Sequence, residues 1–75
     1  MNAEIYTKND CPYCVRAKAL LQKHNVDFTE INAVEHRSAL IARVTDETGS
    51  PPKTVPQIWL DGKYVGGYDQ LAELF

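Results

Sequence analysis

The chain has 75 residues, of which 44% are hydrophobic, and its 8 basic and 10 acidic residues leave a formal net charge of −2. This length and apolar content are typical of one small globular domain, which we expect to span residues 1–75, and they argue against disorder. No run of like charges favours a nucleic-acid partner or a membrane surface, and no apolar stretch approaches the ~18 residues of a membrane span.

The first part of the chain predicts a strand, a helix and a second strand. Glu4–Thr7 is rich in β-branched and aromatic residues, which favours a short strand. A helix is expected over Pro12–His24, because proline is well suited to a first helical turn. Val26–Ile31 predicts the next strand, although Glu30 interrupts its alternation of polar and apolar residues.

The second part predicts a helix, a β-hairpin and a final helix. Apolar residues at helical spacing indicate a helix over Glu35–Thr48, which a glycine ends. Gln57–Leu60 and Lys63–Val65 flank Asp61-Gly62, a strong signal for a two-residue hairpin turn. A short helix is expected over Tyr68–Phe75.

The resulting order, β-α-β-α-β-β-α, predicts an α/β fold. A helix that crosses between the first two strands makes them parallel, with a right-handed connection, whereas the hairpin adds an antiparallel pair. We therefore expect a mixed four-stranded sheet with helices on both faces.

Cys11 and Cys14 are the only cysteines, and they stand where a predicted strand gives way to a helix. A bridge between them closes too small a loop to staple a fold, so the pair is better interpreted as a redox dithiol. The free N–H groups and the dipole at the helix start favour a thiolate at Cys11. We expect Cys11 to be the nucleophile, helped by the nearby cation of Lys8, and the more buried Cys14 to be the resolving thiol.

Other interpretations of these residues are less favoured. The pair lacks the second C-x-x-C of many zinc sites, and the 11 residues between His24 and His36 do not fit a zinc finger, so we expect no metal site. Both histidines are expected to be solvated helix residues. Inert buried cysteines and an ordinary surface role for Lys8 remain alternatives.

The N-terminal residues show no basic start followed by an apolar core, so no signal peptide is expected there. A lone C-x-x-C pair without an export signal favours a reducing, cytoplasmic compartment.

Four motifs resemble those of the glutaredoxins in their order and spacing, and the resemblance extends over essentially the whole chain. They are Ile5-Tyr6-Thr7-Lys8, Cys11-Pro12-Tyr13-Cys14 followed by Val15-Arg16-Ala17-Lys18, Thr54-Val55-Pro56-Gln57 and Gly66-Gly67-Tyr68-Asp69. The chain is most similar to small bacterial and phage-encoded members with a dithiol site. The resemblance implies a thioredoxin fold and glutathione as the reductant.

The resemblance also implies one half of a glutathione-binding site. Lys8 would bind the glycine carboxylate of glutathione, and Tyr13 would border its sulfur atom. Val55 would pair its backbone N–H and C=O with the cysteinyl unit, as one rung of an added strand, and Thr54 would line the same edge. Pro56 is expected to be cis. An ordinary loop that leads into a strand is the alternative for these three consecutive residues.

The other half of the implied site lies at the start of the last helix. Free N–H groups of Gly67, Tyr68 and Asp69 would bind the γ-glutamyl carboxylate. The carboxylate of Asp69 would accept a hydrogen bond from the amino group of the ligand. Many family members have an acid at the position of Gln70, so this contact is shifted here. A role for Asp69 as a helix cap alone is the alternative.

The implied activity is that of a glutathione-disulfide oxidoreductase that reduces protein disulfides and glutathione mixed disulfides, and ribonucleotide reductase is one possible acceptor. No bound cofactor is expected, glutathione is a co-substrate, and the protein is expected to be a monomer. The alternatives are a thioredoxin-like hydrogen donor served by a flavoprotein reductase, a [2Fe–2S] cluster carrier, which Pro12 disfavours in the family, and a peptide-binding module.

Overall fold

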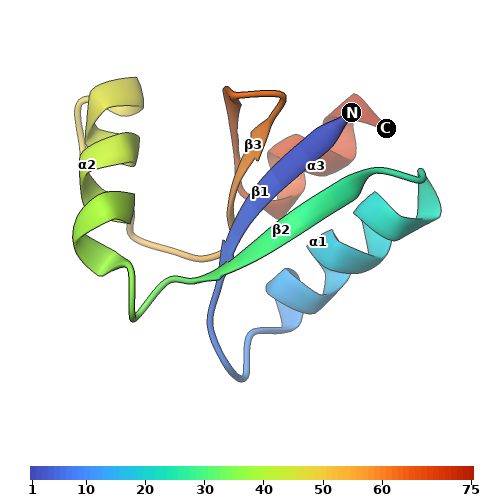
Figure 1. The fold of residues 1–75 in the computed structure, drawn as a ribbon, viewed down its shortest axis with the longest axis horizontal. Coiled ribbons are helices and arrows are strands. Elements are labelled where there is room, and N and C mark those ends of the chain that lie inside the picture. Colours follow the sequence, from blue (N-terminus) through green and yellow to red (C-terminus); the bar gives the residue numbers. More distant parts are fainter.

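A four-stranded mixed sheet forms the middle layer of the computed structural model, which describes residues 1–75 (Figure 1). The strands lie in the order β2-β1-β3-β4. Strand β1 (Asn2–Thr7) runs parallel to β2 (Asp27–Asn32) and antiparallel to β3 (Gln57–Leu60), which pairs with β4 (Lys63–Gly66). The predicted mixed four-stranded sheet is confirmed.

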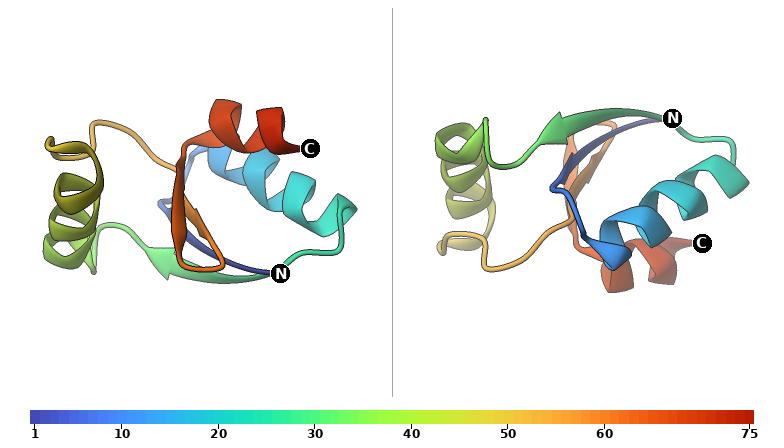
Figure 2. Two further views of the ribbon diagram at one scale, coloured as in Figure 1. Left: turned by 90° about the horizontal axis from the view of Figure 1, so that it is seen from above. Right: turned by 90° about the horizontal axis from the view of Figure 1, so that it is seen from below.

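Helices cover both faces of this sheet, also as predicted. Helices α1 (Pro12–Lys23) and α3 (Tyr68–Leu74) lie on one face, whereas α2 (Arg37–Thr48) lies on the other (Figure 2). None of the three has the length and apolar character of a segment that crosses a bilayer.

The face toward α1 and α3 holds the main hydrophobic core. Alternate residues of β1 point to opposite faces of the sheet, so Ala3 and Ile5 turn toward α1 while Tyr6 turns toward α2. The seven buried members of this core are Ala3, Ile5, Ala17, Leu21, Val26, Ile58 and Leu71. Because β1 and α1 both contribute to it, the loop between them, which carries the first cysteine, is held at both ends.

Helix α2 stands farther from the sheet, and large side chains fill the space between them. The ring of Trp59 lies 5.5 Å from that of Tyr6 and 5.0 Å from that of Tyr64. The guanidinium carbon of Arg43 lies 4.0 Å from the centre of the Trp59 ring, and its nitrogens donate hydrogen bonds to the carboxylate of Glu4 and to the Tyr6 hydroxyl. This layer of aromatic rings and one cation fixes α2 on the sheet.

Two boundaries show how local chemistry sets the elements. Asp61 and Gly62 both have positive φ angles, 48° and 81°, as the predicted hairpin turn requires. Helix α2 begins at Arg37, two residues later than predicted, because the side chain of Asn32 accepts hydrogen bonds from the N–H groups of Val34 and Glu35 and forms a turn there.

Candidate active site

Cys11 caps the N-terminus of α1. Its backbone is extended, and its Sγ atom accepts a hydrogen bond from the backbone N–H of Cys14 across 3.2 Å. Pro12 follows in the first helical turn, where its missing N–H costs nothing. The two cysteines are joined in a disulfide, with their Cα atoms 5.2 Å apart. The sulfur of Cys11 therefore lies where helix N–H groups stabilise negative charge once the bond is reduced.

The two sulfur-bearing residues differ in their exposure and in their neighbours. Cys11 is 9% exposed and Cys14 only 2%. Sγ of Cys11 also lies 3.7 Å from the carbonyl oxygen of Val55, in the loop before β3. An incoming sulfur atom thus reaches Cys11 more readily than Cys14, which agrees with the expected roles of nucleophile and resolving thiol.

The loop beside Cys11 offers unpaired backbone. The Val55–Pro56 peptide bond is cis, as predicted. No backbone–backbone hydrogen bond of the structure involves Val55, whose carbonyl oxygen contacts only Sγ of Cys11. Gln57 of β3 attaches this loop to the sheet. Its side chain donates a hydrogen bond to the carbonyl of Thr54 across 2.9 Å and accepts one from the Tyr64 hydroxyl of β4. The sequence analysis placed Gln57 at the end of the Thr54-Val55-Pro56-Gln57 motif but assigned it no role.

A groove of about 310 Å³ runs past this loop. The rings of Tyr13 and Tyr68 lie 5.9 Å apart, and the guanidinium of Arg16 lies 5.1 Å from the centre of the Tyr13 ring. The groove brings together seven of the eight residues expected to bind glutathione. These are Tyr13, Thr54, Val55, Pro56, Gly67, Tyr68 and Asp69.

The eighth residue, Lys8, lies outside this groove. It lines a second groove that shares Thr54 and Val55 with the first and adds two further cations, Arg37 and Lys53. None of the three cations forms an ion pair within the protein. The two grooves together form a path from Asp69, past Val55, to a basic end that includes Lys8.

The start of α3 corrects one of the sequence interpretations. Its N-cap is Gly67, whose N–H donates to the side-chain oxygen of Gln70 across 2.9 Å. Asp69 lies within the first turn and makes no side-chain hydrogen bond, so its interpretation as a helix cap is wrong. Gln70 completes the cap instead, because its side chain, three residues beyond Gly67, reaches back to the N–H of that residue. The carboxylate of Asp69 is thereby left without a partner beside the groove.

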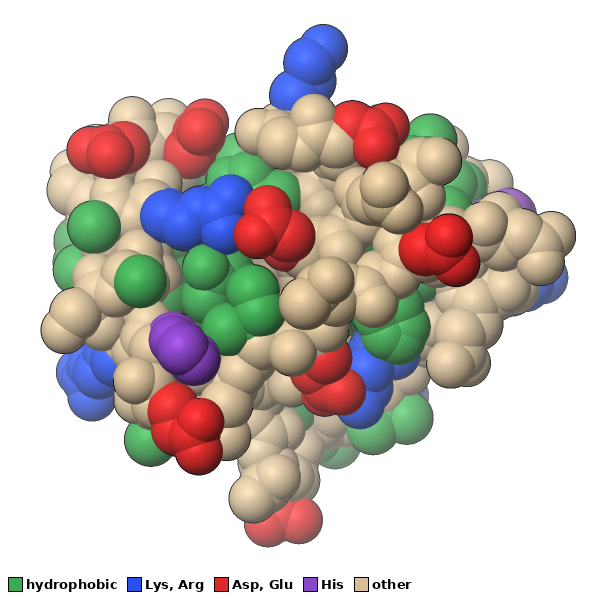
Figure 3. All heavy atoms as spheres, viewed as in Figure 1, with side chains coloured by type: hydrophobic (Ala, Val, Ile, Leu, Met, Phe, Trp, Pro, Cys, Tyr) green, Lys and Arg blue, Asp and Glu red, His purple; other side chains and the backbone are tan.

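Both histidines are exposed, as expected, but they flank helices and do not lie within them: His24 is the C-cap of α1 and His36 the N-cap of α2. The ring of His24 stacks on that of Phe75 at 4.5 Å, and His36 precedes α2 without making a side-chain hydrogen bond there. Acidic and basic side chains are interspersed over the face shown in Figure 3, without a large area of one sign.

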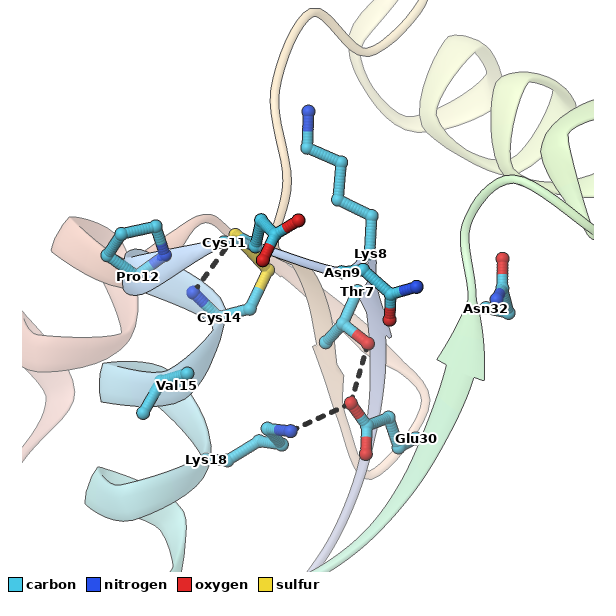
Figure 4. Close-up of a pocket in the computed structure, with 11 residues that line it drawn as sticks. Thr7, Lys8, Asn9, Cys11, Pro12, Cys14, Val15, Lys18, Glu30 and Asn32 are labelled. Carbon is cyan, nitrogen blue, oxygen red and sulfur yellow. Dashed lines mark hydrogen bonds and ion pairs between the residues drawn. A yellow bond between two sulfur atoms is a disulfide. The ribbon is translucent and has the colours of Figure 1, made fainter.

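A larger cleft, of about 780 Å³, opens on the other side of the disulfide and is lined by both cysteines and by Lys8 (Figure 4). On its wall the Glu30 carboxylate accepts hydrogen bonds from the Thr7 hydroxyl at 2.7 Å and from the Lys18 ammonium at 2.9 Å. The hydrogen bond from Thr7, followed by that from Lys18, lowers the pKa of Glu30. The sequence predicted no such group.

Known proteins resemble this chain over almost its whole length. Residues 3–65 match the model of the family described as Glutaredoxin. The chain is 50% identical to a glutaredoxin of Pseudomonas aeruginosa over 70 residues, which are 93% of this chain and 80% of that protein. It is 44% identical over 73 residues to glutaredoxin 3 of Escherichia coli, covering 97% of this chain and 84% of the relative.

A solved structure agrees with the fold. The crystal structure of a buckwheat glutaredoxin–glutathione complex superposes with a TM-score of 0.77 at 29% identity, over 95% of this chain and 64% of that one. The predicted thioredoxin fold is thereby confirmed.

Proposed function

Because this chain belongs to the glutaredoxin family of thiol–disulfide oxidoreductases, we propose that its Cys11–Cys14 dithiol takes its electrons from glutathione. The substrates would be glutathione mixed disulfides and protein disulfides, with the disulfide of a ribonucleotide reductase as one candidate. We propose that the protein acts as a monomer in a reducing, cytoplasmic compartment, without a bound cofactor.

The observation that carries this proposal is the backbone of Val55, which makes no backbone–backbone hydrogen bond and lies beside the sulfur of Cys11. An extended cysteinyl peptide whose sulfur bonds to Cys11 could pair with the N–H and C=O of Val55 as an added strand. Its amino end would then lie toward the carboxylate of Asp69 and its carboxyl end toward Lys8. Glutathione fits this arrangement, because it has an ammonium group at the end that would face Asp69 and a glycine carboxylate at the end that would face Lys8.

The proposed reaction is thiol–disulfide exchange. The Cys11 thiolate attacks the glutathione sulfur of a mixed disulfide, and the substrate leaves as its thiolate and takes up a proton. A second glutathione thiolate then attacks the Cys11–glutathione disulfide and releases oxidised glutathione. For a protein disulfide, Cys14 closes the Cys11–Cys14 bond, and two glutathione molecules reopen it.

A pair of coupled assays tests the reductant. The purified protein would be given a small mixed disulfide with either glutathione, glutathione reductase and NADPH, or a thioredoxin reductase and NADPH. We expect turnover in the first system only. Turnover only with the flavoprotein thioredoxin reductase would contradict this proposal and show that the protein is a thioredoxin-like hydrogen donor.

A further inference from the structure

The carboxylate of Glu30 lies on a face of β2 that the strand pattern assigns to apolar residues. Phe28, two residues earlier and on the same face, packs against the core beneath α1. Glu30 is instead joined to the Thr7 hydroxyl of β1 and the Lys18 ammonium of α1, and we call these three residues the Lys18 network. Three separate elements thus combine to place one ammonium group.

The Lys18 network and Cys14 line the same cleft. Lys18 is one turn beyond Cys14 on α1, so the two side chains share a face of the helix. Both line the cleft of about 780 Å³, and its other charged groups are Lys8, Asp10 and Glu30. In Figure 4 Lys8 extends away from the network, whereas Lys18 and Glu30 lie on the same side of the disulfide as Cys14.

The position of Cys14 creates a need for such a cation. Its sulfur must lose a proton before it can attack, and burial with 2% exposure favours the neutral thiol. The helix cap does not remove this cost, because the N–H of Cys14 points at the sulfur of Cys11. A fixed positive charge across a water-accessible cleft would favour the Cys14 thiolate.

We propose that Lys18, held by Glu30 and Thr7, is a positioning residue that favours the thiolate of Cys14 in the step that closes the disulfide. This inference rests on the proposed function only for the identity of the leaving group. The Cys14 thiol gives its proton to water in the cleft, and its thiolate attacks Sγ of Cys11 in the mixed disulfide. The Cys11–Cys14 bond forms, the bond from Cys11 to the sulfur of the substrate protein breaks, and the substrate thiolate leaves and takes up a proton.

Glu30 has the role of an anchor in this account. A carboxylate that accepts two hydrogen bonds at one oxygen, and whose pKa is lowered by them, is a poor acceptor for a thiol proton. A free lysine side chain is flexible, so the anchor keeps the ammonium near the cleft.

The first test measures the acidity of Cys14 without glutathione. In a Cys11→Ser protein, the rate of alkylation of Cys14 by iodoacetamide would be followed against pH. Replacing Lys18 by Met should move the midpoint upward and lower the reactive fraction near neutral pH about three- to tenfold, the change produced by half to one pH unit. Lys18→Arg should restore the profile. Lys23→Met, a matched change at an exposed lysine of the same helix, should leave it unaltered.

The second test times the closing step. Reduced protein with both cysteines would be mixed with an aromatic disulfide that releases a coloured thiolate, once when Cys11 attacks and again when Cys14 closes the bond. Lys18→Met should slow only the second release, and glutathione-dependent turnover of a Cys14→Ser protein should not change when Lys18→Met is added. Glu30→Gln, which keeps an oxygen for both donors, should not slow closure.

Three outcomes would overturn the assignment of Lys18. The first is an unchanged alkylation midpoint in Lys18→Met. The second is a loss of turnover on adding Lys18→Met to the Cys14→Ser protein that equals the loss in the protein with both cysteines. The third is a closing step slowed about tenfold by Glu30→Gln, which would make the carboxylate the proton acceptor. Because alkylation and the aromatic disulfide need no glutathione, these results stand even if another reductant serves the protein.

Discussion

The backbone N–H of Cys14 donates its hydrogen bond to the sulfur of Cys11, 3.2 Å away, so the helix cap and the proposed nucleophile are the same atom. The residues preferred at this position are serine, threonine, aspartate and asparagine, which accept the hydrogen bond with a side-chain oxygen. Here a sulfur takes it, and the interaction that begins the helix also stabilises negative charge on Cys11 after reduction.

The cysteines should therefore not be equivalent in function. Cys11→Ser is expected to reduce turnover of a glutathione mixed disulfide to the uncatalysed rate, because no thiolate remains at the cap. Cys14→Ser should retain most of that turnover, because glutathione itself can release Cys11, but should lose reduction of protein disulfides that need the second thiol. Coupled assays with both substrates measure this, and equal losses in the two variants would contradict the assigned roles.

Lys8→Ala is expected to raise the KM for glutathione about fivefold with a smaller change in kcat, as the loss of one exposed charge contact of roughly 1 kcal/mol would do. The reason is its position at the basic end of the path that passes Val55. Lys63→Ala, at an exposed lysine of β4, is the matched control and should leave KM unaltered. An unchanged KM in Lys8→Ala would remove Lys8 from the proposed site.

Asp69 and Gln70 should separate binding from stability. Asp69→Asn is expected to raise the KM for glutathione without changing the unfolding midpoint, because its carboxylate makes no side-chain hydrogen bond within the protein. Gln70→Ala should lower the free energy of unfolding by about 1 kcal/mol, because the N–H of Gly67 loses its partner. Steady-state kinetics and urea unfolding of both variants distinguish the roles, and the reverse pattern would show that the acceptor of the amino group is Gln70.

These adjacent residues also show where sequence reasoning reached its limit. The motifs at Cys11 and at the Asp61-Gly62 turn predict local structure correctly, because a few neighbouring residues determine the backbone there. The roles of Asp69 and Gln70 depend on which residue is the N-cap of α3. Because Gly67 is the N-cap, Gln70 is the third residue of the helix and its side chain accepts the hydrogen bond from the Gly67 N–H.

Contacts among distant elements were still less accessible from the sequence. The Lys18 network joins β1, β2 and α1, and its one local sign was the polar residue that interrupts the second strand. Arg43 gave no sign at all, because its partners Glu4, Tyr6 and Trp59 are brought to it only when α2 folds over the sheet.

Arg43→Met should lower the free energy of unfolding by about 1–2 kcal/mol, since it removes a paired guanidinium from the face of Trp59. Trp59 is the only tryptophan, so its fluorescence should also report the loss of the cation above its ring. Arg37→Met, at an exposed arginine of the same helix without an ion pair, should change stability by less than about 0.5 kcal/mol. Similar losses in the two variants would show that general charge on α2, and not the stacked contact, stabilises the helix.

The stability of the fold should also depend on Glu30 in acid. Hydrogen bonds from Thr7 and then Lys18 hold its pKa below the ordinary value of 4.5, so the folded protein binds this proton less readily than the unfolded chain. The carboxylate therefore stabilises the fold fully above that value, and the contribution is lost as the pH falls through the folded pKa. Urea unfolding of the wild type and of Glu30→Gln should give free energies of unfolding that differ near neutral pH and converge in acid.

Glu73→Gln, at an exposed glutamate without a side-chain hydrogen bond, is the control and should show no such convergence. A difference between Glu30→Gln and the wild type that stayed constant with pH would mean that hydrogen-bond geometry, not charge, causes the effect.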